Sequence, residues 1–267
     1  MGGVGMSVLL EKTALVPGAS HGVRRIRADE PWRWLAAGWA DMRAVPSISL
    51  AYGFVFFLIS LSLAGLLFLF KLGAFLPVMA AGFLLLGPML AVGLYEASRR
   101  LEAGLPVRFA DVAFVSTRNL TQLAFLGAML MGAMIVWLQI AGWLFALFYG
   151  PVGLPPLSAF IPALLLTSRG LTLLVVGTAA GAVLAFVVFS ISAISAPLLL
   201  ARDIDAVTAV LTSIEAVRHN FWPMLLWAWI VTLLTAFGIA SGFLGLVVIF
   251  PLLGHATWHA HRALAGS

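Results

Sequence analysis

The amino-acid sequence predicts an all-α protein that crosses a membrane several times. Of its 267 residues, 63% are hydrophobic and 9% are charged, whereas a typical soluble domain carries about 25% charged residues. Its mean hydropathy is +1.10. The apolar residues form long runs without charge, and a run of ~20 such residues is long enough to span a bilayer as a helix. We therefore expect a polytopic bundle of six transmembrane helices.

The predicted membrane domain covers residues 46–264. The first span is the clearest because it contains no charged residue, and at ~1.5 Å per residue it exceeds the ~30 Å hydrocarbon core. The six spans are expected at about 48–70, 74–98, 120–148, 171–201, 221–240 and 243–262.

Small and polar residues within the spans indicate where helices contact each other. Gly177 and Gly181 lie four residues apart in the fourth span and predict close helix packing. Gln139 lies near the middle of the third span. We expect it to face another helix, because an amide exposed to lipid lacks hydrogen-bond partners.

Three amphipathic helices are expected on the cytoplasmic surface, at 29–45, 107–118 and 205–220. Residues 1–28, before the first of them, are predicted to form a mobile cytoplasmic tail. The helix at 29–45 combines three tryptophans with charges, which favours a position at the level of the lipid headgroups. Its expected apolar face contains Trp32, Leu35, Trp39 and Met42. The alternative is a helix packed on its own protein.

Residues 150–170 form an unusual connection that is rich in proline and carries one charge, Arg169. The segment is too short and too rich in proline for a full span, so a re-entrant or surface-lying segment is one interpretation. An ordinary hydrophobic loop that packs over the helix ends is the other.

The charged residues predict the orientation. Six spans place Lys71 and Arg169 outside, and the remaining 13 of the 15 Lys and Arg residues inside, together with all ten acids. Because positive charge is retained on the cytoplasmic side, both termini are expected in the cytoplasm, and the protein in the inner membrane of a bacterium. The basic residues flank the spans, so the positive net charge does not indicate nucleic-acid binding.

A sequence pattern near the cytoplasmic end of the second span recurs twice. Residues 88–101, PMLAVGLYEASRRL, match 251–264, PLLGHATWHAHRAL, and a shorter copy begins at Pro197. Three quasi-equivalent units follow, each with an inward span, an interfacial helix and an outward span. We interpret the pattern as a structural exit unit with a kinking proline, an aromatic residue at the interface and an anchoring arginine. Its residues are Pro88, Tyr95, Arg99, Pro197, Pro251, Trp258 and Arg262.

Few residues indicate catalysis or cofactor binding. The absence of cysteine excludes disulfides and thiolate chemistry. His255 and His259 are separated by four residues, which is acceptable spacing for a metal or haem, but His261 points to another side of the helix and no carboxylate follows. A structural role is the favoured interpretation, and no cofactor is expected. Asp203 or Asp205 is expected to cap the following helix.

The segments GPMLAVGLYEASRRLEAG, ARDIDAVTAVLTSIEAVRHN and FLGLVVIFPLLGHATWHAHRAL resemble a bacterial family of predicted integral membrane proteins of unknown function. The resemblance covers about residues 30–264. Some members of the family carry the label cytochrome c oxidase subunit I, which implies an association with respiratory complexes. The resemblance implies no established activity and no ligand residues.

Together these features predict a membrane protein that is not an enzyme. The expected function is scaffolding, assembly or an accessory role in a membrane complex, in contact with the lipid bilayer and with other membrane proteins or further copies of itself. One alternative is a pore or transporter for a neutral, apolar or lipid substrate. A second alternative is a haem or metal protein that uses His255 and His259.

Overall fold

The computed structural model describes residues 22–150 and 157–265, and in this part of the chain the regular structure is entirely helical. The predicted tail therefore lies mostly outside the described residues. The helices are α2 (Glu30–Ala44), α3 (Pro46–Leu69), the short 3₁₀ helix η1 (Gly73–Phe75), α4 (Leu76–Leu90), α5 (Val92–Glu102), α6 (Phe109–Ala113), α7 (Leu120–Tyr149), α8 (Leu157–Leu166), α9 (Ser168–Ser192), α10 (Ser195–Ala201), α11 (Ala206–His219), α12 (Phe221–Ala240) and α13 (Leu246–Ala265).

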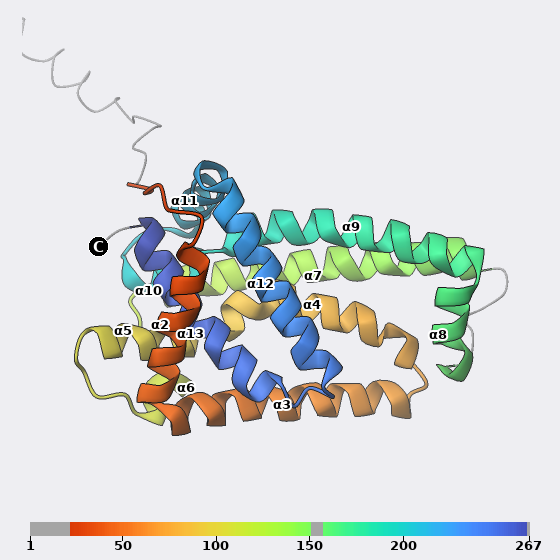
Figure 1. Cartoon of the computed structure of the whole chain (residues 1–267), viewed down its shortest axis with the longest axis horizontal. Coiled ribbons are helices and arrows are strands. Elements are labelled where there is room, and N and C mark those ends of the chain that lie inside the picture. Colours follow the sequence, from red (N-terminus) through yellow and green to blue (C-terminus); the bar gives the residue numbers. More distant parts are fainter. Residues whose placement is uncertain (1–21, 151–156, 266–267) are drawn as a thin grey trace, which may run out of the picture.

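Five helical segments of the described chain are long and apolar enough to cross a membrane. They are α3, α4 with α5, α7, α9 with α10, and α12. In Figure 1, α3, α4, α7 and α9 run side by side along the long axis of the molecule. The turn containing Lys71 and the start of α9, which contains Arg169, lie at one end of this bundle, and the cytoplasmic end predicted from the other charges lies opposite.

The sixth predicted span coincides with α13, which is not among the five apolar segments. Its C-terminal half contains three histidines and Arg262, and most of its residues are buried inside the protein. Figure 1 shows α12 and α13 running obliquely to the four long helices. The described chain begins and ends at the same end of the bundle, where the backbone N–H of Arg24 donates to the Leu264 carbonyl over 2.9 Å.

Proline and local backbone geometry divide two of the long segments. Pro88 lies inside α4, which ends two residues later, and α5 begins after Ala91. Because proline has no N–H, the ladder of helix hydrogen bonds loses one member there. The Tyr52 hydroxyl donates to the Leu90 carbonyl over 2.7 Å and so satisfies an acceptor at this break. Ala193 and Ile194 separate α9 from α10 in a similar way, three residues before Pro197.

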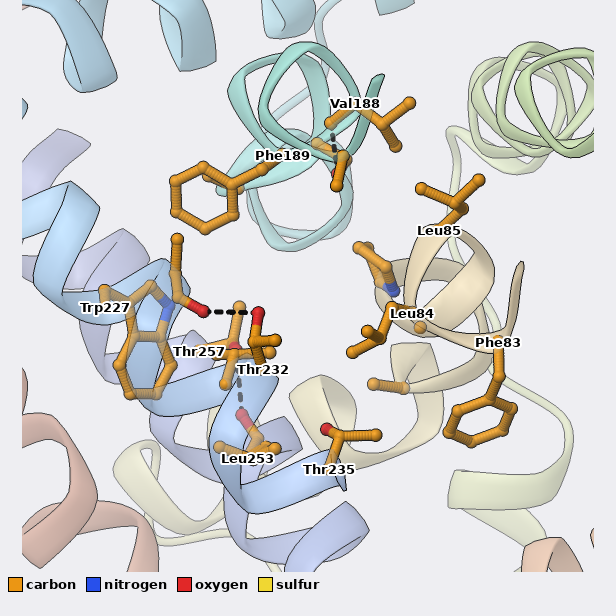
Figure 2. A pocket seen from close by; sticks show the side chains of 18 of the residues that line it. Phe83, Leu84, Leu85, Val188, Phe189, Trp227, Thr232, Thr235, Leu253 and Thr257 are labelled. Carbon is orange, nitrogen blue, oxygen red and sulfur yellow. Dashed lines mark hydrogen bonds between the residues drawn. The ribbon is translucent and has the colours of Figure 1, made fainter. Parts of the chain in front are cut away.

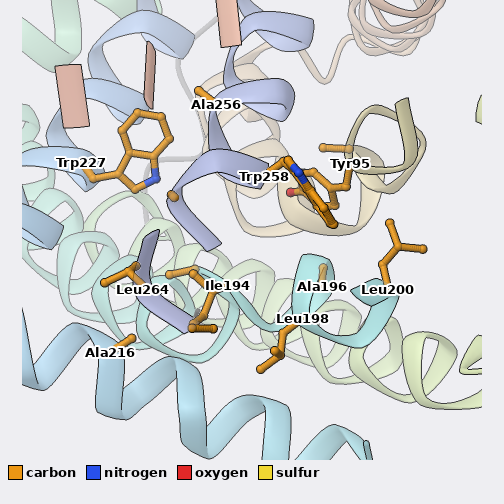
Figure 3. Packing of buried hydrophobic residues seen from close by; sticks show 14 of the residues in the cluster. Tyr95, Ile194, Ala196, Leu198, Leu200, Ala216, Trp227, Ala256, Trp258 and Leu264 are labelled. Carbon is orange, nitrogen blue, oxygen red and sulfur yellow. The ribbon is translucent and has the colours of Figure 1, made fainter. Parts of the chain in front are cut away.

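The core lies where α5, α10 and α13 contact one another at the end of the bundle (Figure 3). Tyr95 from α5 and Trp258 from α13 are 1% and 2% exposed. Helices α5 and α13 pack against each other, so both rings are enclosed by the protein and lie in its core. The prediction that they lie at the level of the membrane interface stays a prediction.

Helix α2 packs along α13, its main neighbour, through Pro31, Trp34, Gly38 and Met42. This face is rotated from the one expected from the sequence. Trp34 is buried, and its ring meets that of Trp227 edge-on at 5.6 Å. Trp32 and Trp39 remain 57% and 42% exposed. One face of α2 thus packs on the protein itself, and the opposite face leaves Trp32 and Trp39 exposed. Its position at the level of the lipid headgroups stays a prediction.

The other short helices are arranged around the ends of the bundle. Helix α6 occupies only part of the predicted stretch 107–118. Helix α11 begins at an N-cap formed by Asp205, which accepts from the Thr208 N–H over 2.9 Å, as the sequence predicted. Helix α8 contains Pro162 and runs across the far ends of the long helices in Figure 1. A helix in this position agrees with a surface-lying segment for the described part of 150–170.

Helix α7 contacts both α4 and α9. Gly181 faces the ring of Trp137, and Gly177 lies near Leu144, so both glycines point toward α7. The indole of Trp137 donates to the Val78 carbonyl of α4 over 2.8 Å. Gln139, in contrast, is exposed. It faces no other helix of the described chain, because Trp137, two residues away, occupies the inner face of α7. The prediction that Gln139 faces another helix therefore requires a helix of a second protein chain.

Candidate functional site

A cavity of about 360 Å³ lies between α4, α9, α12 and α13. This volume falls within the range of ~300–1,000 Å³ that is usual for small-molecule sites. Phe83, Phe189 and Phe250 contribute aromatic rings, and Trp227 closes one side. Figure 2 shows side chains from these helices converging on the space between them. No Asp, Glu, Lys, Arg or His is among the residues that line it, so the described cavity is apolar and uncharged.

The cavity exists because α9 and α12 do not pack along their lengths. Neighbouring helix pairs such as α4 with α7 and α3 with α13 pack closely, but α9 and α12 are not among the packed pairs of the described chain. The rings of Phe186 and Phe221 meet at 6.1 Å and close the gap locally. Small residues then leave space unfilled, namely Gly87 on α4, Ala182 and Ala185 on α9 and Ala228 on α12.

A second candidate site is a chain of hydrogen bonds at the end of the bundle that contains the termini. His255 is buried between Ser49 of α3 and Ser98 of α5, with ring nitrogen to hydroxyl distances of 2.9 and 2.8 Å. Ser98 donates to Asp41 of α2 over 2.6 Å. The same carboxylate oxygen lies 2.8 Å from Nε2 of His259. Side chains from four helices therefore form one connected polar network, which we call the Asp41 network.

The direction of each hydrogen bond in the Asp41 network follows from the ionised state of Asp41. A carboxylate accepts only, so the single proton of the Ser98 hydroxyl is directed to it. Ser98 must then accept from Nδ1–H of His255, and in neutral His255 the Nε2 atom accepts from Ser49. The histidine is consequently held as the Nδ1–H tautomer. This order resembles a Ser–His–acid relay, but neither Ser49 nor His255 lines either cavity that the structure describes.

The neighbours of Asp41 in this network lower its pKa. Burial raises the pKa of Asp41, but hydrogen bonds from His259 and Ser98, together with the coulombic effects of His259 and His255, outweigh burial and hold the pKa below its usual value. Asp41 is therefore ionised at neutral pH. The arrangement clamps α2 to α5 and α13 through charge-assisted hydrogen bonds, which are stronger than neutral ones.

Among the remaining predicted exit-unit residues, Trp258 and Arg262 form hydrogen bonds between α13 and α5, and Arg99 forms an ion pair within α5. Arg99 pairs with Glu96 at 2.7 Å, and Glu96 is 2% exposed. Glu102 accepts from the indole of Trp258 over 3.0 Å and from Arg262 over 2.9 Å. The arginines thus join α5 internally and to α13. Pro88 lines the cavity, whereas Pro197 and Pro251 are buried in α10 and α13.

The three histidines considered as metal ligands lie on two different sides of α13. His255 and His259 lie on one side of α13 and both belong to the Asp41 network. His261 is buried on another side, beside the ring of Trp258, and both of its ring nitrogens lack a hydrogen bond. Within residues 22–150 and 157–265, no group of three or more His, Asp and Glu residues is placed to hold a metal ion.

Sequence reasoning missed both sites. The cavity depends on how far α9 and α12 diverge, which periodicity does not report. The Asp41 network joins residues up to 218 positions apart, so no local spacing reveals it. The one available signal was the presence of Ser49, Ser98 and His255 beside apolar residues, since buried polar groups require partners.

The fold defines a multi-pass, all-helical integral membrane protein. The model of a family described as "Predicted integral membrane protein (DUF2189)" matches residues 75–201, which extend from the end of η1 through α10. The resemblance to predicted integral membrane proteins of unknown function is thereby confirmed over this stretch. No curated protein matches the chain, and no solved structure does.

Proposed function

We propose that this protein is a non-catalytic membrane protein that binds an apolar molecule, such as the acyl chain of a lipid, in the cavity between α4, α9, α12 and α13. One observation supports the proposal most directly. Helices that are apolar enough to span a membrane leave an uncharged cavity of about 360 Å³ between them. In a bilayer, the acyl chains of the surrounding lipids are available to fill such a space.

Access is proposed to be lateral, from the lipid. Helices α9 and α12 diverge beside the cavity, and both expose apolar side chains such as Val183 and Leu233. A charged headgroup has no counter-charge among the lining residues, and its burial without a partner is costly. The headgroup of a bound lipid therefore stays outside, and only its chain enters. This differs from a transporter, which requires a path for the whole substrate.

Filling the cavity tests this function. Ala228 of α12 lines the cavity, and Ala228→Phe places a ring in it. Native mass spectrometry of the protein purified in mild detergent should show bound apolar molecules on the wild type, and several-fold less on the variant. Val183→Phe is the control, because Val183 is 68% exposed on α9 and does not line the cavity. Equal occupancy in all three proteins contradicts the proposal.

The orientation and internal symmetry extend the proposal. We infer that the chain crosses a bacterial inner membrane six times, with α13 as the last crossing and both termini in the cytoplasm. The meeting of residues 24 and 264 supports an even number of crossings, with both ends of the described chain on one side, and the distribution of Lys and Arg supports the cytoplasm as that side. Three quasi-equivalent units are supported by the mutual contacts of α5, α10 and α13, each of which also touches a short helix, α6, α11 or α2. The cavity lies in the unit whose inward helix is α9 and whose outward helix is α12, because these two helices diverge.

A second candidate function is assembly, in a scaffolding or accessory role. Gln139 favours it, because its exposed amide has no hydrogen-bond partner among the described residues, although it lies between exposed apolar neighbours such as Val136 and Trp143. An unpaired amide in hydrocarbon is unfavourable. An amide both donates and accepts, so Gln139 of a second copy is a complementary partner. Gly132 on the same helix leaves room for close approach.

Cysteine crosslinking distinguishes this second function, since the chain has no native cysteine. Gln139→Cys should form a disulfide-linked dimer in native membranes under mild oxidation. Leu61→Cys, on the exposed side of α3, serves as the control at 48% exposure. Equal crosslinking at the two positions contradicts pairing through Gln139. A crosslink to a different protein would show that this protein, and not a second copy, is the partner at Gln139.

A further inference from the structure

Three of the four serine and threonine hydroxyls that line the cavity are satisfied by their own helix. Ser192 donates to the Val188 carbonyl, Thr232 to that of Ala228 and Thr257 to that of Leu253, over 2.7–2.8 Å. Each bond reaches back four residues, which is the usual arrangement for a hydroxyl in an apolar helix. These three groups therefore require nothing from a bound molecule.

Thr235 is the exception among these four hydroxyls, and the Tyr95 hydroxyl and the Trp227 indole N–H at the cavity likewise make no hydrogen bond with a described residue. Thr235 lines the cavity and is 5% exposed, yet its hydroxyl makes no hydrogen bond with any residue that the structure describes. The oxygen is also not among the buried polar atoms that are sealed off from any space, so it retains access to the cavity. Figure 2 shows Thr235 among the side chains around the space, apart from the bonded Thr232 and Thr257.

An unpaired hydroxyl in this environment indicates a polar group on the molecule that fills the cavity. Leaving a buried hydroxyl without a partner costs roughly 1–3 kcal/mol. A helix carbonyl is the alternative partner, and the three neighbouring hydroxyls all use one. Because the lining contains no charge, a carboxylate or ammonium group on the ligand would remain unpaired. An uncharged group that donates or accepts one hydrogen bond fits the site.

We propose that the cavity selects an uncharged, elongated amphiphile with one hydrogen-bonding group, and that this group binds Thr235. A long-chain alcohol represents the class. This inference rests on the proposed function, because it names the chemistry of the molecule that enters the same cavity. It goes further in requiring that a polar end, and not only a hydrocarbon chain, lies inside the protein.

A matched pair of ligands tests the inference. Radiolabelled decanol and decane differ by one hydroxyl, and retention of each by the purified wild-type protein gives its affinity. A net hydrogen bond of about 0.5–1.5 kcal/mol predicts that decanol binds about two- to twelvefold more tightly than decane. Thr235→Val, which keeps the shape of the side chain, should remove this preference and leave decane binding unchanged.

Control variants keep the outcomes distinct. Thr232→Val removes a hydroxyl that is bonded to Ala228, so the preference for decanol should persist, and Thr235→Ser should retain it as well. A preference that survives Thr235→Val, or is absent from the wild type, overturns the assignment of Thr235 while apolar binding stands. Failure of both ligands to bind the wild type overturns the proposed function itself. Thermal unfolding of each variant verifies that it is folded.

Discussion

Asp41 links three helices, α2, α5 and α13, at the end of the bundle that contains the termini. Its carboxylate accepts from Ser98 of α5 and His259 of α13, and Ser98 in turn holds His255. Removing the charge leaves these buried donors without their acceptor, and such losses are larger than the loss of an exposed ion pair. Local polar chemistry therefore fixes the position of α2.

Asp41→Ala should lower the free energy of unfolding by about 2–4 kcal/mol, because two charge-assisted hydrogen bonds are lost while Ser98 stays buried and His259 partly buried. The measurement is reversible unfolding in mixed detergent micelles. Asp29→Ala is the matched control on the same segment, since Asp29 pairs with exposed Arg27 and Arg33. A loss for Asp41→Ala no larger than that for Asp29→Ala contradicts the central position of Asp41.

The same residue predicts a dependence on pH. The pKa of Asp41 is lower in the folded protein than its usual value, because hydrogen bonds from His259 and Ser98 outweigh burial, which alone raises it. The folded state therefore binds fewer protons than the unfolded state, and the contribution of Asp41 is complete above pH ~4, near the unfolded pKa. It is lost as the pH falls through the folded pKa.

Measurement of the free energy of unfolding between pH 7 and pH 3 tests this predicted direction of the pH dependence. The wild type should lose stability below pH ~4, and the difference between wild type and Asp41→Asn should shrink over the same interval. A difference that grows as the pH falls would show that the sign is wrong.

At the scale of elements, close approach between α3 and α13 depends on one glycine. A Cβ built on Gly53 lies 2.2 Å from the Val247 carbonyl oxygen and 3.0 Å from Cδ of Pro251. Pro251 has no N–H to offer to the carbonyl four residues before it, which is that of Val247. Helix α3 therefore lies directly against a backbone group that the proline frees, and a larger residue at position 53 must push the two helices apart.

Gly53→Val should destabilise the protein by several kcal/mol or prevent its folding, because the neighbouring atoms belong to the backbone and cannot move aside. Gly65→Val on the same helix is the control, since a Cβ there meets no atom within 4 Å. Both changes alter helix propensity equally, so the difference in yield of monodisperse protein and in melting temperature isolates the packing. Similar behaviour of the two variants contradicts the close contact of α3 with α13.

The elements also explain why α13 differs from the five apolar segments. It is polar on the sides that meet α2, α3 and α5, where Ser49, Ser98 and Glu102 provide partners for its histidines and for Arg262. A helix surrounded by its own protein does not need an apolar surface throughout. Hydropathy alone therefore underestimates how deeply such a helix is embedded.

At the scale of the whole molecule, the charges divide between the two ends of the bundle. Lys71 lies in the turn between α3 and η1, at the end opposite the described termini. Ala103 and Gly104 lie in the exposed connection that follows α5, at the other end. The expected topology can therefore be tested by comparing the accessibility of one residue at each end of the bundle.

Lys71→Cys should react with a membrane-impermeant maleimide in intact cells or spheroplasts, whereas Ala103→Cys should react only after the membrane is permeabilised. The absence of native cysteine makes each label specific. Protection at Lys71→Cys with reaction at Ala103→Cys would reverse the orientation proposed from the positive charges.

The sequence by itself determined the membrane class, the α-helical content and the approximate positions of the long helices, because apolar runs of ~20 residues have few other stable states in a bilayer. It also narrowed the cap of α11 to Asp203 or Asp205, since capping depends on neighbours only a few residues away, and the structure shows that Asp205 is the cap. The resemblance to a family of predicted integral membrane proteins likewise needed no coordinates.

Only the tertiary structure decided which side of each helix is buried. Trp34 and Tyr95 entered the core, Gln139 turned outward, and Asp41 met His259 from the other end of the chain. In a span that is apolar on all sides, hydrophobic periodicity carries little information, so rotation about the helix axis is set by small residues, prolines and long-range hydrogen bonds. The cavity has the same origin, because it depends on how α9 and α12 diverge, and this divergence is a property of the assembled helices.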